Sequence, residues 1–158
     1  MDFNIHTPSI SEDSATFFLY NLSGQIVGYQ RYMPLNFKKK RNDEMGRYYT
    51  YRSNNIGIFG LETYTLDCPC VFLTEGIFDA VRLTRRGCCA LALLCNNPDS
   101  SLYNFLHCLG KPLVSICDKD IGGRSLRKVG HYFEESSEKD LGVSDESFVD
   151  YLIKTYYN

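Results

Sequence analysis

Short apolar runs alternate with amphipathic segments from residue 70 onward, and this alternation restricts the fold more than any other feature of the sequence. Three runs are almost continuously apolar, at residues 70–74, 88–95 and 113–117. Such runs are typical of strands that are covered on both faces. Each run is followed by a segment in which apolar residues recur at helical spacing. Strands and helices that alternate in such short units form a mainly parallel sheet flanked by helices. The sequence therefore predicts an α/β fold for residues 67–158.

Two helices are expected between these strands. The first covers residues 77–86 and stops at Gly87, a residue type that commonly ends helices. The second takes Asn97 as its cap and Pro98 as its first residue, because Asn is a favoured cap and Pro fits the first turn. Both helices would cover the faces of the sheet.

Two further helices are expected after the third strand. Residues 124–135 carry Leu126, Val129 and Phe133 at helical spacing, so we expect one helix there with these residues facing inward. A loop follows in this interpretation. Ser144 then caps the last helix, whose first turn is acidic, as the helix dipole favours.

The first part of the chain has a different, β-prone pattern. Residues 17–32 indicate a hairpin, since two runs of apolar and aromatic residues flank a short Asn-Leu-Ser-Gly turn. Residues 34–46 are polar and basic without periodicity, which predicts a loop, and residues 48–51 are again β-prone. We therefore expect a small β-rich subdomain over residues 1–66, followed by the α/β domain over residues 67–158.

Charge is distributed unevenly along the chain, although the net charge is only −2. Residues 25–60 are basic, whereas residues 128–150 are acidic. Such asymmetry is typical of a phosphate-binding part beside an acidic part. Charge alone, however, favours the simpler interpretation of two solvated faces of opposite sign. The basic residues of the first region are Arg31, Lys38, Lys39, Lys40, Arg41, Arg47 and Arg52.

The chain contains seven cysteines but no Cys-x-x-Cys pair. Several lie within apolar runs, among them Cys88, Cys89 and Cys95, and free cysteine behaves as a small buried apolar residue in reducing compartments. We expect most of them to be core thiols, and a zinc site near Cys68 and Cys70 is the alternative. The sequence has no apolar run long enough to span a membrane and no signal-peptide pattern, so we expect a cytoplasmic protein.

Carboxylates follow two of the expected parallel strands at the point where each strand ends. Glu75 comes directly after residues 70–74, and Asp118 and Asp120 come directly after residues 113–117. Because ligands of open α/β sheets bind at the carboxyl ends of the strands, we expect these three side chains to face one point. Converging carboxylates repel one another unless a cation lies between them, and oxygen ligands without His or Cys suit magnesium. The alternative is that each segment is an ordinary turn.

Small residues lie beside these carboxylates. Gly76 follows Glu75, and Gly122 and Gly123 follow Asp120. Glycine lets the backbone turn sharply or come close to a phosphate. The joint placement of acids and glycines at two strand ends is more specific than either segment alone.

Two motifs resemble those of the Toprim domain, which is shared by bacterial-type primases, topoisomerases and some nucleases. Residues 71–80, Val-Phe-Leu-Thr-Glu-Gly-Ile-Phe-Asp-Ala, are similar to its first motif, in which an apolar strand ends in Glu-Gly and an Asp follows in the next helix. Residues 115–123 resemble its second motif, Asp-x-Asp followed by small residues. Lys139-Asp140-Leu141 is similar to a Lys-Asp found further along in primases.

The resemblance implies a set of functional residues. Glu75, Asp118 and Asp120 would bind Mg²⁺ or Mn²⁺ and carry the catalysis, with Glu75 also acting as an acid or base. Asp79 and Asp140 would orient these ligands or hold a further metal ion. The phosphates of nucleic acid and nucleotide would contact Arg31, Lys38, Lys39, Lys40, Arg47, Arg52, Lys119, Gly76 and Gly122.

The segment before these motifs resembles the polymerase core of bacterial and phage primases. Residues 24–31 are similar to a hairpin in which Gly-x-Ile/Val-x-Gly leads to an Arg, and residues 48–62 resemble the connection to the Toprim domain. The chain departs from that family in having no Cys/His zinc-binding segment at its start, which would read the template. It also carries Lys119 between its two Asp residues, where a small residue is frequent.

Three functions are compatible with the resemblance. The first is primase-like synthesis of short primers, with single-stranded nucleic acid and nucleoside triphosphates as substrates and a replication protein that selects the template. Tyr48 and Tyr49 would then stack on bases, or they are ordinary sheet residues. The second is a metal-dependent nuclease that uses the same carboxylates. The third is a non-catalytic accessory or decoy protein in replication. The three carboxylates argue against it, because a protein that only binds gains nothing from a costly acidic cluster.

Overall fold

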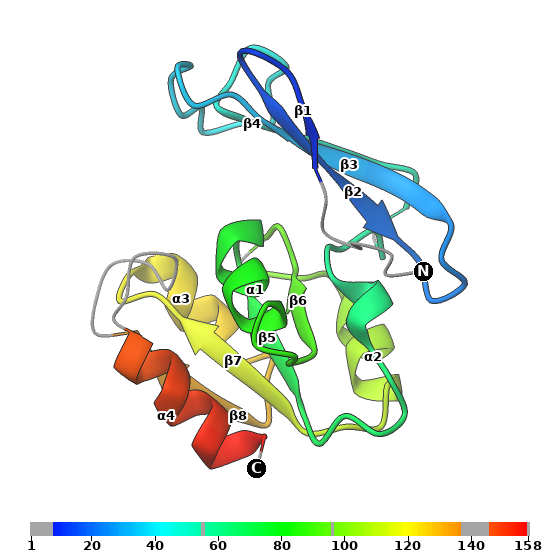
Figure 1. Cartoon of the computed structure of the whole chain (residues 1–158), viewed down its shortest axis with the longest axis vertical. Coiled ribbons are helices and arrows are strands. Elements are labelled where there is room, and N and C mark those ends of the chain that lie inside the picture. The colour runs from blue at the N-terminus through cyan, green and yellow to red at the C-terminus, as the bar shows by residue number, and fades with distance from the viewer. Residues whose placement is uncertain (1–7, 55, 96, 137–145, 158) are drawn as a thin grey trace.

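The N-terminal part of the chain forms a four-stranded antiparallel sheet. The computed structural model of the chain describes residues 8–54, 56–95, 97–136 and 146–157. Strands β1 (Ser9–Ile10), β2 (Ala15–Tyr20), β3 (Ile26–Tyr32) and β4 (Tyr48–Arg52) pair in that order (Figure 1). β2 and β3 form the predicted hairpin, and Asn21 closes its turn by accepting hydrogen bonds from the backbone N–H groups of Ser23 and Gln25.

The second sheet is parallel throughout and contains the three predicted buried strands. Strands β5 (Val71–Thr74), β6 (Ala90–Ala92), β7 (Leu113–Cys117) and β8 (Tyr132–Glu135) lie in the order β6-β5-β7-β8. All residues of β5, β6 and β7 are buried. Their side chains alternate between two covered faces, which is why the sequence runs are continuously apolar. The predicted α/β fold with a parallel sheet is confirmed.

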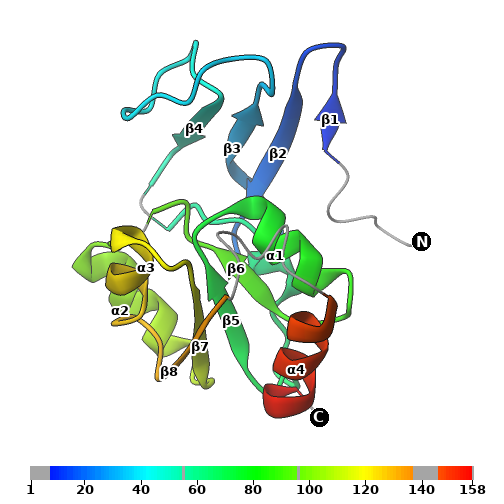
Figure 2. The same cartoon turned by 90° about the vertical axis from the view of Figure 1, so that its left-hand side faces the viewer.

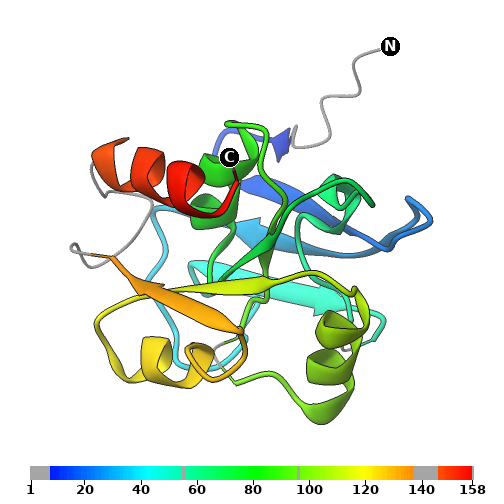
Figure 3. The ribbon, with the colours of Figure 1, turned by 90° about the horizontal axis from the view of Figure 1, so that it is seen from below.

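Helices cover both faces of the parallel sheet. Helices α1 (Ile77–Thr84) and α4 (Glu146–Tyr156) pack on one face, and α2 (Ser100–Cys108) and α3 (Ile121–Leu126) pack on the other (Figure 3). None of the helices in the described part of the chain is long and apolar enough to cross a membrane.

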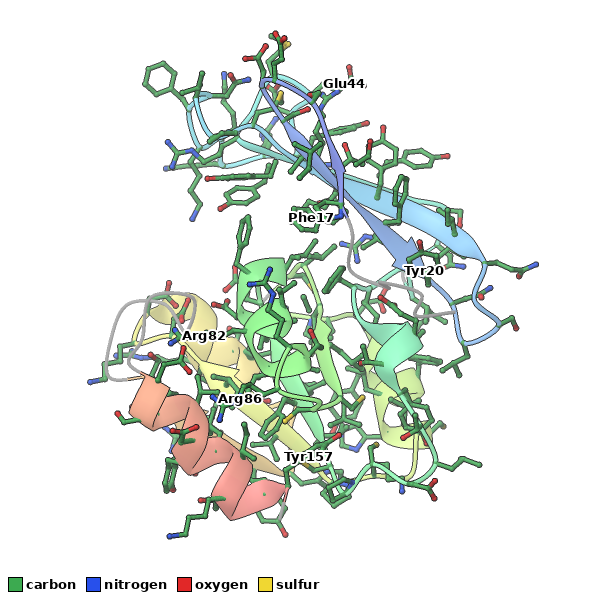
Figure 4. The ribbon with its side chains drawn as sticks, in the orientation of Figure 1. Phe17, Tyr20, Glu44, Arg82, Arg86 and Tyr157 are labelled. Atoms are coloured by element: carbon green, nitrogen blue, oxygen red, sulfur yellow. The ribbon has the colours of Figure 1, made fainter. Side chains whose placement is uncertain are left out.

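Ion pairs hold α4 against α1. Arg82 of α1 pairs with Glu146, and Arg86, just after the end of α1, pairs with Glu146 and Asp150. Figure 4 labels both arginines. These contacts are exposed, so each contributes little to stability, but together they fix the position of the helix. Part of the acidic region of the sequence is therefore neutralised within the fold.

Side chains from the two sheets share one core. Phe17 of β2 lies in the same buried cluster as Phe72 of β5. The ring of Phe78, on α1, contacts Phe17 and Tyr32 edge to face, with centroid distances of 5.6 and 5.1 Å. Phe59 contacts Phe17 as well, at 6.2 Å. Figure 2 shows the antiparallel sheet standing over α1 and β6, and in Figure 4 the labelled Phe17 lies between the two parts.

The helix predicted over residues 124–135 is wrong beyond Leu126, where α3 ends. Turns over residues 127–131 and then β8 replace the rest of the expected helix. Within these turns Gly130 lies so close to Ser115 of β7 that a Cβ atom on this glycine would be 2.7 Å from the Ser115 Oγ atom. Phe133, which was expected to face inward, is 39% exposed and lies 3.5 Å under the Arg127 guanidinium. Apolar spacing in so short a segment fits an edge strand as well as a helix.

The start of α2 also differs from the prediction. Asp99, not Asn97, is the cap, since its carboxylate accepts a hydrogen bond from the Leu102 backbone N–H at 2.9 Å. The second buried strand, expected over residues 88–95, is shorter at both ends. It cannot extend through Leu94, whose φ of 59° is outside the range of extended backbone. The predicted cap Ser144 lies outside the described residues.

Most of the cysteines are core thiols, as predicted. The buried ones are Cys68, Cys70, Cys88, Cys89 and Cys117, and all seven cysteines are free. Burial raises the pKa of Cys70 and of Cys89 to about 12. These thiols therefore stay protonated and unreactive at neutral pH.

The carboxyl group of Glu62 is buried in a short 3-10 helix, Leu61–Thr63, that precedes the parallel sheet. Burial raises its pKa from 4.5 to about 7. The folded state therefore binds the proton of Glu62 more tightly than the unfolded state does, and this proton binding stabilises the fold. Its contribution to the free energy of unfolding is fully present below pH 4.5. It is lost as the pH rises through about 7.

Replacing Glu62 by Gln should remove this pH dependence. We expect the stability of Glu62→Gln relative to the wild type to rise by about 3 kcal/mol between acidic and mildly alkaline pH. Urea denaturation at pH values on either side of the titration measures the difference, and Glu12→Gln, which alters an exposed carboxylate, is the control. An offset between Glu62→Gln and wild type that is the same at every pH would contradict the prediction.

Candidate active site

The carboxyl ends of β5 and β7 meet at one edge of the parallel sheet. The two strands are neighbours, and Leu73 of β5 pairs with Ser115 of β7. Glu75 follows the end of β5, and Asp118 follows the end of β7. β6 lies on the other side of β5, so the strand order reverses between β5 and β7, which is where open α/β sheets bind ligands. Glu75 and Asp118 thus flank the expected position of a ligand.

The turn after β5 holds the backbone of Glu75 in place. The Glu75 carbonyl oxygen accepts a hydrogen bond from the Leu94 backbone N–H at 3.0 Å. Gly76 caps α1 in an extended conformation, and its carbonyl oxygen accepts a hydrogen bond from the Thr74 hydroxyl at 3.0 Å. Of the described non-glycine residues, Leu94 alone has a positive φ, and backbone strain of this kind clusters at functional sites. No pattern in the sequence points to Leu94, because leucine there is typical of an apolar strand.

A close backbone contact shapes the turn after β7. A Cβ atom on Gly123 would be 1.8 Å from the Asp118 carbonyl oxygen, an approach that only glycine allows. The Asp120 carboxylate accepts a hydrogen bond from the Gly123 backbone N–H at 2.8 Å and so caps α3. Gly122 is buried in the first turn of α3, and Lys119 is exposed. The Asp-x-Asp-x-Gly-Gly segment therefore forms a tight strand-to-helix turn.

The two further carboxylates of the predicted site have different positions. Asp79 lies in the first turn of α1 and is only 9% exposed. Its Oδ2 atom is 3.2 Å from where a Cβ atom on Gly76 would lie, so it packs against the turn that carries Glu75. A negative charge is favoured in the first turn of a helix. Asp140 lies outside the described residues.

The three predicted metal ligands do not surround a single point. Within the described residues, no three Asp, Glu, His or Cys side chains are placed to hold a metal ion. Asp120 accounts for part of this difference, because its carboxylate caps α3. Glu75 and Asp118 remain at adjacent strand ends, and Mg²⁺ commonly uses one or two carboxylates together with water and substrate phosphates. The chemistry of this donor pair therefore fits magnesium.

The basic residues predicted to bind phosphate divide between two places. Arg52 is the last residue of β4, and its guanidinium donates a hydrogen bond to the Gly57 carbonyl oxygen at 3.4 Å. It pairs with the buried Gly28, so it lies on the face of the N-terminal sheet that is turned toward the parallel sheet. The others belong to β3 and to the segment between β3 and β4, and they are Arg31, Lys38, Lys39, Lys40 and Arg47.

Comparison with known proteins gives matches in structure only. No family model and no curated protein matches the sequence. The E. coli primase catalytic core matches with a TM-score of 0.65 at 15% identity, over 96% of this chain and 57% of that chain. The primase fragment of the bacteriophage T7 primase-helicase protein matches with a TM-score of 0.62 at 15% identity, over 92% of this chain and 63% of that chain. The DnaG primase catalytic domain bound to single-stranded DNA matches with a TM-score of 0.65 at 16% identity, over 92% of this chain and 52% of that chain. This chain has the fold of a primase catalytic core.

The primase core fold accounts for both sheets, since the matches extend over nearly the whole chain. The resemblance seen in the sequence is thereby confirmed at the level of the fold, including the β-rich part before the parallel sheet. The chain spans about half the length of the first primase structures that it matches.

Proposed function

We propose that this chain is a magnesium-dependent nucleotidyltransferase that synthesises short primers on a single-stranded template. The observation that carries the proposal is the position of Glu75 and Asp118 at adjacent strand ends, on either side of the point where the strand order reverses. The primase core fold supports it, and one of the matched primase domains is bound to single-stranded DNA. Selection of the template falls to a partner replication protein in this proposal.

The residues at the strand-end edge have separate roles in this proposal. Glu75 and Asp118, together with Asp120, which also caps α3, would hold Mg²⁺ or Mn²⁺. The metal when bound neutralises triphosphate charge and activates the attacking hydroxyl. Arg52 and Lys119 would place positive charge near the triphosphate. Asp79 would support the turn that carries Glu75.

Primer synthesis by the purified chain tests the proposal. Incubation with single-stranded DNA, ribonucleotides and Mg²⁺ or Mn²⁺ should give short oligonucleotides. Glu75→Gln keeps the size of the side chain but removes the charge, so we expect it to lower the rate at least about 100-fold. Labelled products separated on a denaturing gel measure the effect.

The control is Glu12→Gln, the same change at an exposed carboxylate outside the strand-end edge, which should leave the rate unchanged. Thermal unfolding of both variants would show that neither substitution disrupts the fold. Degradation of the template that depends on Glu75 would identify a nuclease instead. Equal synthesis by the wild type and Glu75→Gln, or no reaction from either, would contradict the proposal.

A further inference from the structure

One face of the N-terminal sheet points away from the shared core. Residues that pair directly across antiparallel strands point to the same face. Phe17 and Gln30 pair, and Phe17 contacts Phe78 of α1, so these positions face inward. The neighbouring positions therefore face outward, in one row of Phe18, Tyr29 and Tyr51 and a second row of Thr16, Arg31 and Tyr49.

The outward face carries a group of aromatic rings, Phe18, Tyr29, Tyr49 and Tyr51, here termed the outer aromatic face. The rings of Tyr29 and Tyr51 stack with a centroid distance of 5.7 Å and an interplanar angle of 30°. Tyr49 meets Tyr29 at 6.2 Å. Tyr51 is 54% exposed, which leaves part of its ring free for a further contact.

Tyr48 is not part of this group. It pairs with Tyr32 on the inward face, at a centroid distance of 5.1 Å. The two tyrosines that the sequence suggested for base stacking therefore lie on opposite faces of the sheet. Only Tyr49 belongs to the outer aromatic face.

Positive charge lies within this face and along its edge. The Arg31 guanidinium lies over the Tyr49 ring, 5.6 Å from its centroid, and donates a hydrogen bond to the Glu44 carbonyl oxygen at 2.8 Å. The Asn42 side chain accepts a hydrogen bond from the Thr50 backbone N–H at 2.8 Å and donates one to the Thr50 carbonyl oxygen. These bonds hold the loop along the free edge of β4. The loop carries the exposed residues Lys38, Lys39, Lys40 and Arg41.

Acidic residues in the same loop are fewer than the basic ones. Asp43 accepts a hydrogen bond from the Met45 backbone N–H, and the Glu44 side chain hydrogen-bonds to Tyr49. Both carboxylates keep their negative charge in these contacts. The four basic residues Lys38, Lys39, Lys40 and Arg41 outnumber the two acids, so the net charge next to the outer aromatic face is positive.

We infer that the outer aromatic face binds the bases of single-stranded nucleic acid. Exposed rings offer a stacking surface for any base, and cations along one edge fit a phosphate backbone that runs past the rings. A duplex conceals its base faces and would not use such rings. The inference extends the proposed function, because it gives the template a second attachment, on the face of the N-terminal sheet that is turned away from the strand-end edge.

Fluorescence anisotropy of labelled oligothymidine with the full chain tests the inference, in EDTA and without nucleotides. We expect Tyr51→Thr to weaken binding at least about fivefold, the lower limit of what one stacked base contributes. Tyr51→Phe keeps the ring and should bind within about twofold of the wild type. Tyr132→Thr makes the same change at another strand tyrosine that is 54% exposed, on β8, and should bind like the wild type.

Photocrosslinking locates the contact. An iodouracil-substituted oligonucleotide should crosslink to the peptides that contain Tyr29, Tyr49 or Tyr51. Four results would each overturn the inference. They are crosslinks confined to other peptides, equal affinity of Tyr51→Thr and Tyr51→Phe, tighter binding of duplex than of single strands, and no binding at all. Binding of oligouridine as tight as that of oligothymidine would support the inference equally, and RNA would then be a ligand of this face.

The result is separable from the test of the proposed function. Binding is measured without metal and nucleotide, so Glu75→Gln should bind oligothymidine like the wild type. Absence of primer synthesis by the wild type, with oligothymidine binding intact, would refute only the proposed function. Primer synthesis that is retained while Tyr51→Thr binds normally would refute only the outer aromatic face.

Discussion

Gly60→Ala is expected to lower the free energy of unfolding by more than about 3 kcal/mol. Gly60 has a φ of 91°, a left-handed conformation that costs a residue with a side chain about 1–2 kcal/mol. A Cβ atom there would also be 2.1 Å from the Ala90 carbonyl oxygen in β6. Both partners in that contact are backbone, so neither a rotamer change nor a small side-chain shift relieves it. Urea denaturation of the variant and the wild type gives the difference.

Gly87→Ala is the matched control for this prediction. Gly87 has a φ of 82°, but nothing lies within 4 Å of its Cβ position. We therefore expect only the conformational cost, about 1–2 kcal/mol. The prediction fails if Gly60→Ala loses no more stability than Gly87→Ala, since the close approach to Ala90 would then have no energetic effect.

Asp120→Asn is expected to lower primer synthesis at least about 100-fold while leaving stability nearly unchanged. The structure assigns Asp120 the cap of α3, and the sequence resemblance implies a metal ligand. Asn and Asp cap helices about equally well, so Asn keeps the first role. It lacks the negative charge that the second role requires. The product assay and thermal unfolding of the same protein preparation measure the two roles separately.

Asp120→Ala should lose both roles, with a cost of about 1 kcal/mol in stability. Asp99→Asn, the same substitution at the cap of α2, calibrates how well Asn replaces Asp in this protein. Full activity of Asp120→Asn would contradict the prediction and would restrict Asp120 to capping.

The edge of the site was predictable because it depends on the parallel strands. A buried parallel strand leaves a continuous apolar run, and Glu75 and Asp118 are the first charged residues after two such runs. Crossovers between parallel strands put both strand ends at one edge of the sheet but do not fix the strand order. The pairing of Leu73 with Ser115 shows that β5 and β7 are neighbours. The direction of a single side chain is not encoded in this way. Asp120 faces the Gly123 N–H group, a local interaction that competes with metal binding.

Short elements without strong periodicity were harder to predict. The edge strand β8 is largely exposed on both faces, so no alternation of buried and exposed residues marks it as a strand in the sequence. Asp99 and Asn97 are both good caps, and only the geometry of the chain selects Asp99. The division of the basic residues between the inward face of the N-terminal sheet and the outer aromatic face depends on strand register. Register places Arg31 opposite Tyr49, and a shift of one residue would reverse the face.

The core shared by the two sheets is built from segments that lie far apart in the sequence. Phe17 of β2 contacts Phe59, which precedes the parallel sheet, and Phe78 of α1. During synthesis on a ribosome, the antiparallel sheet emerges before either of these rings. Proteins often fold from the N-terminus as they are made, but this sheet cannot bury Phe17 until α1 has emerged. A nascent chain therefore carries an exposed phenylalanine until the parallel sheet begins to form.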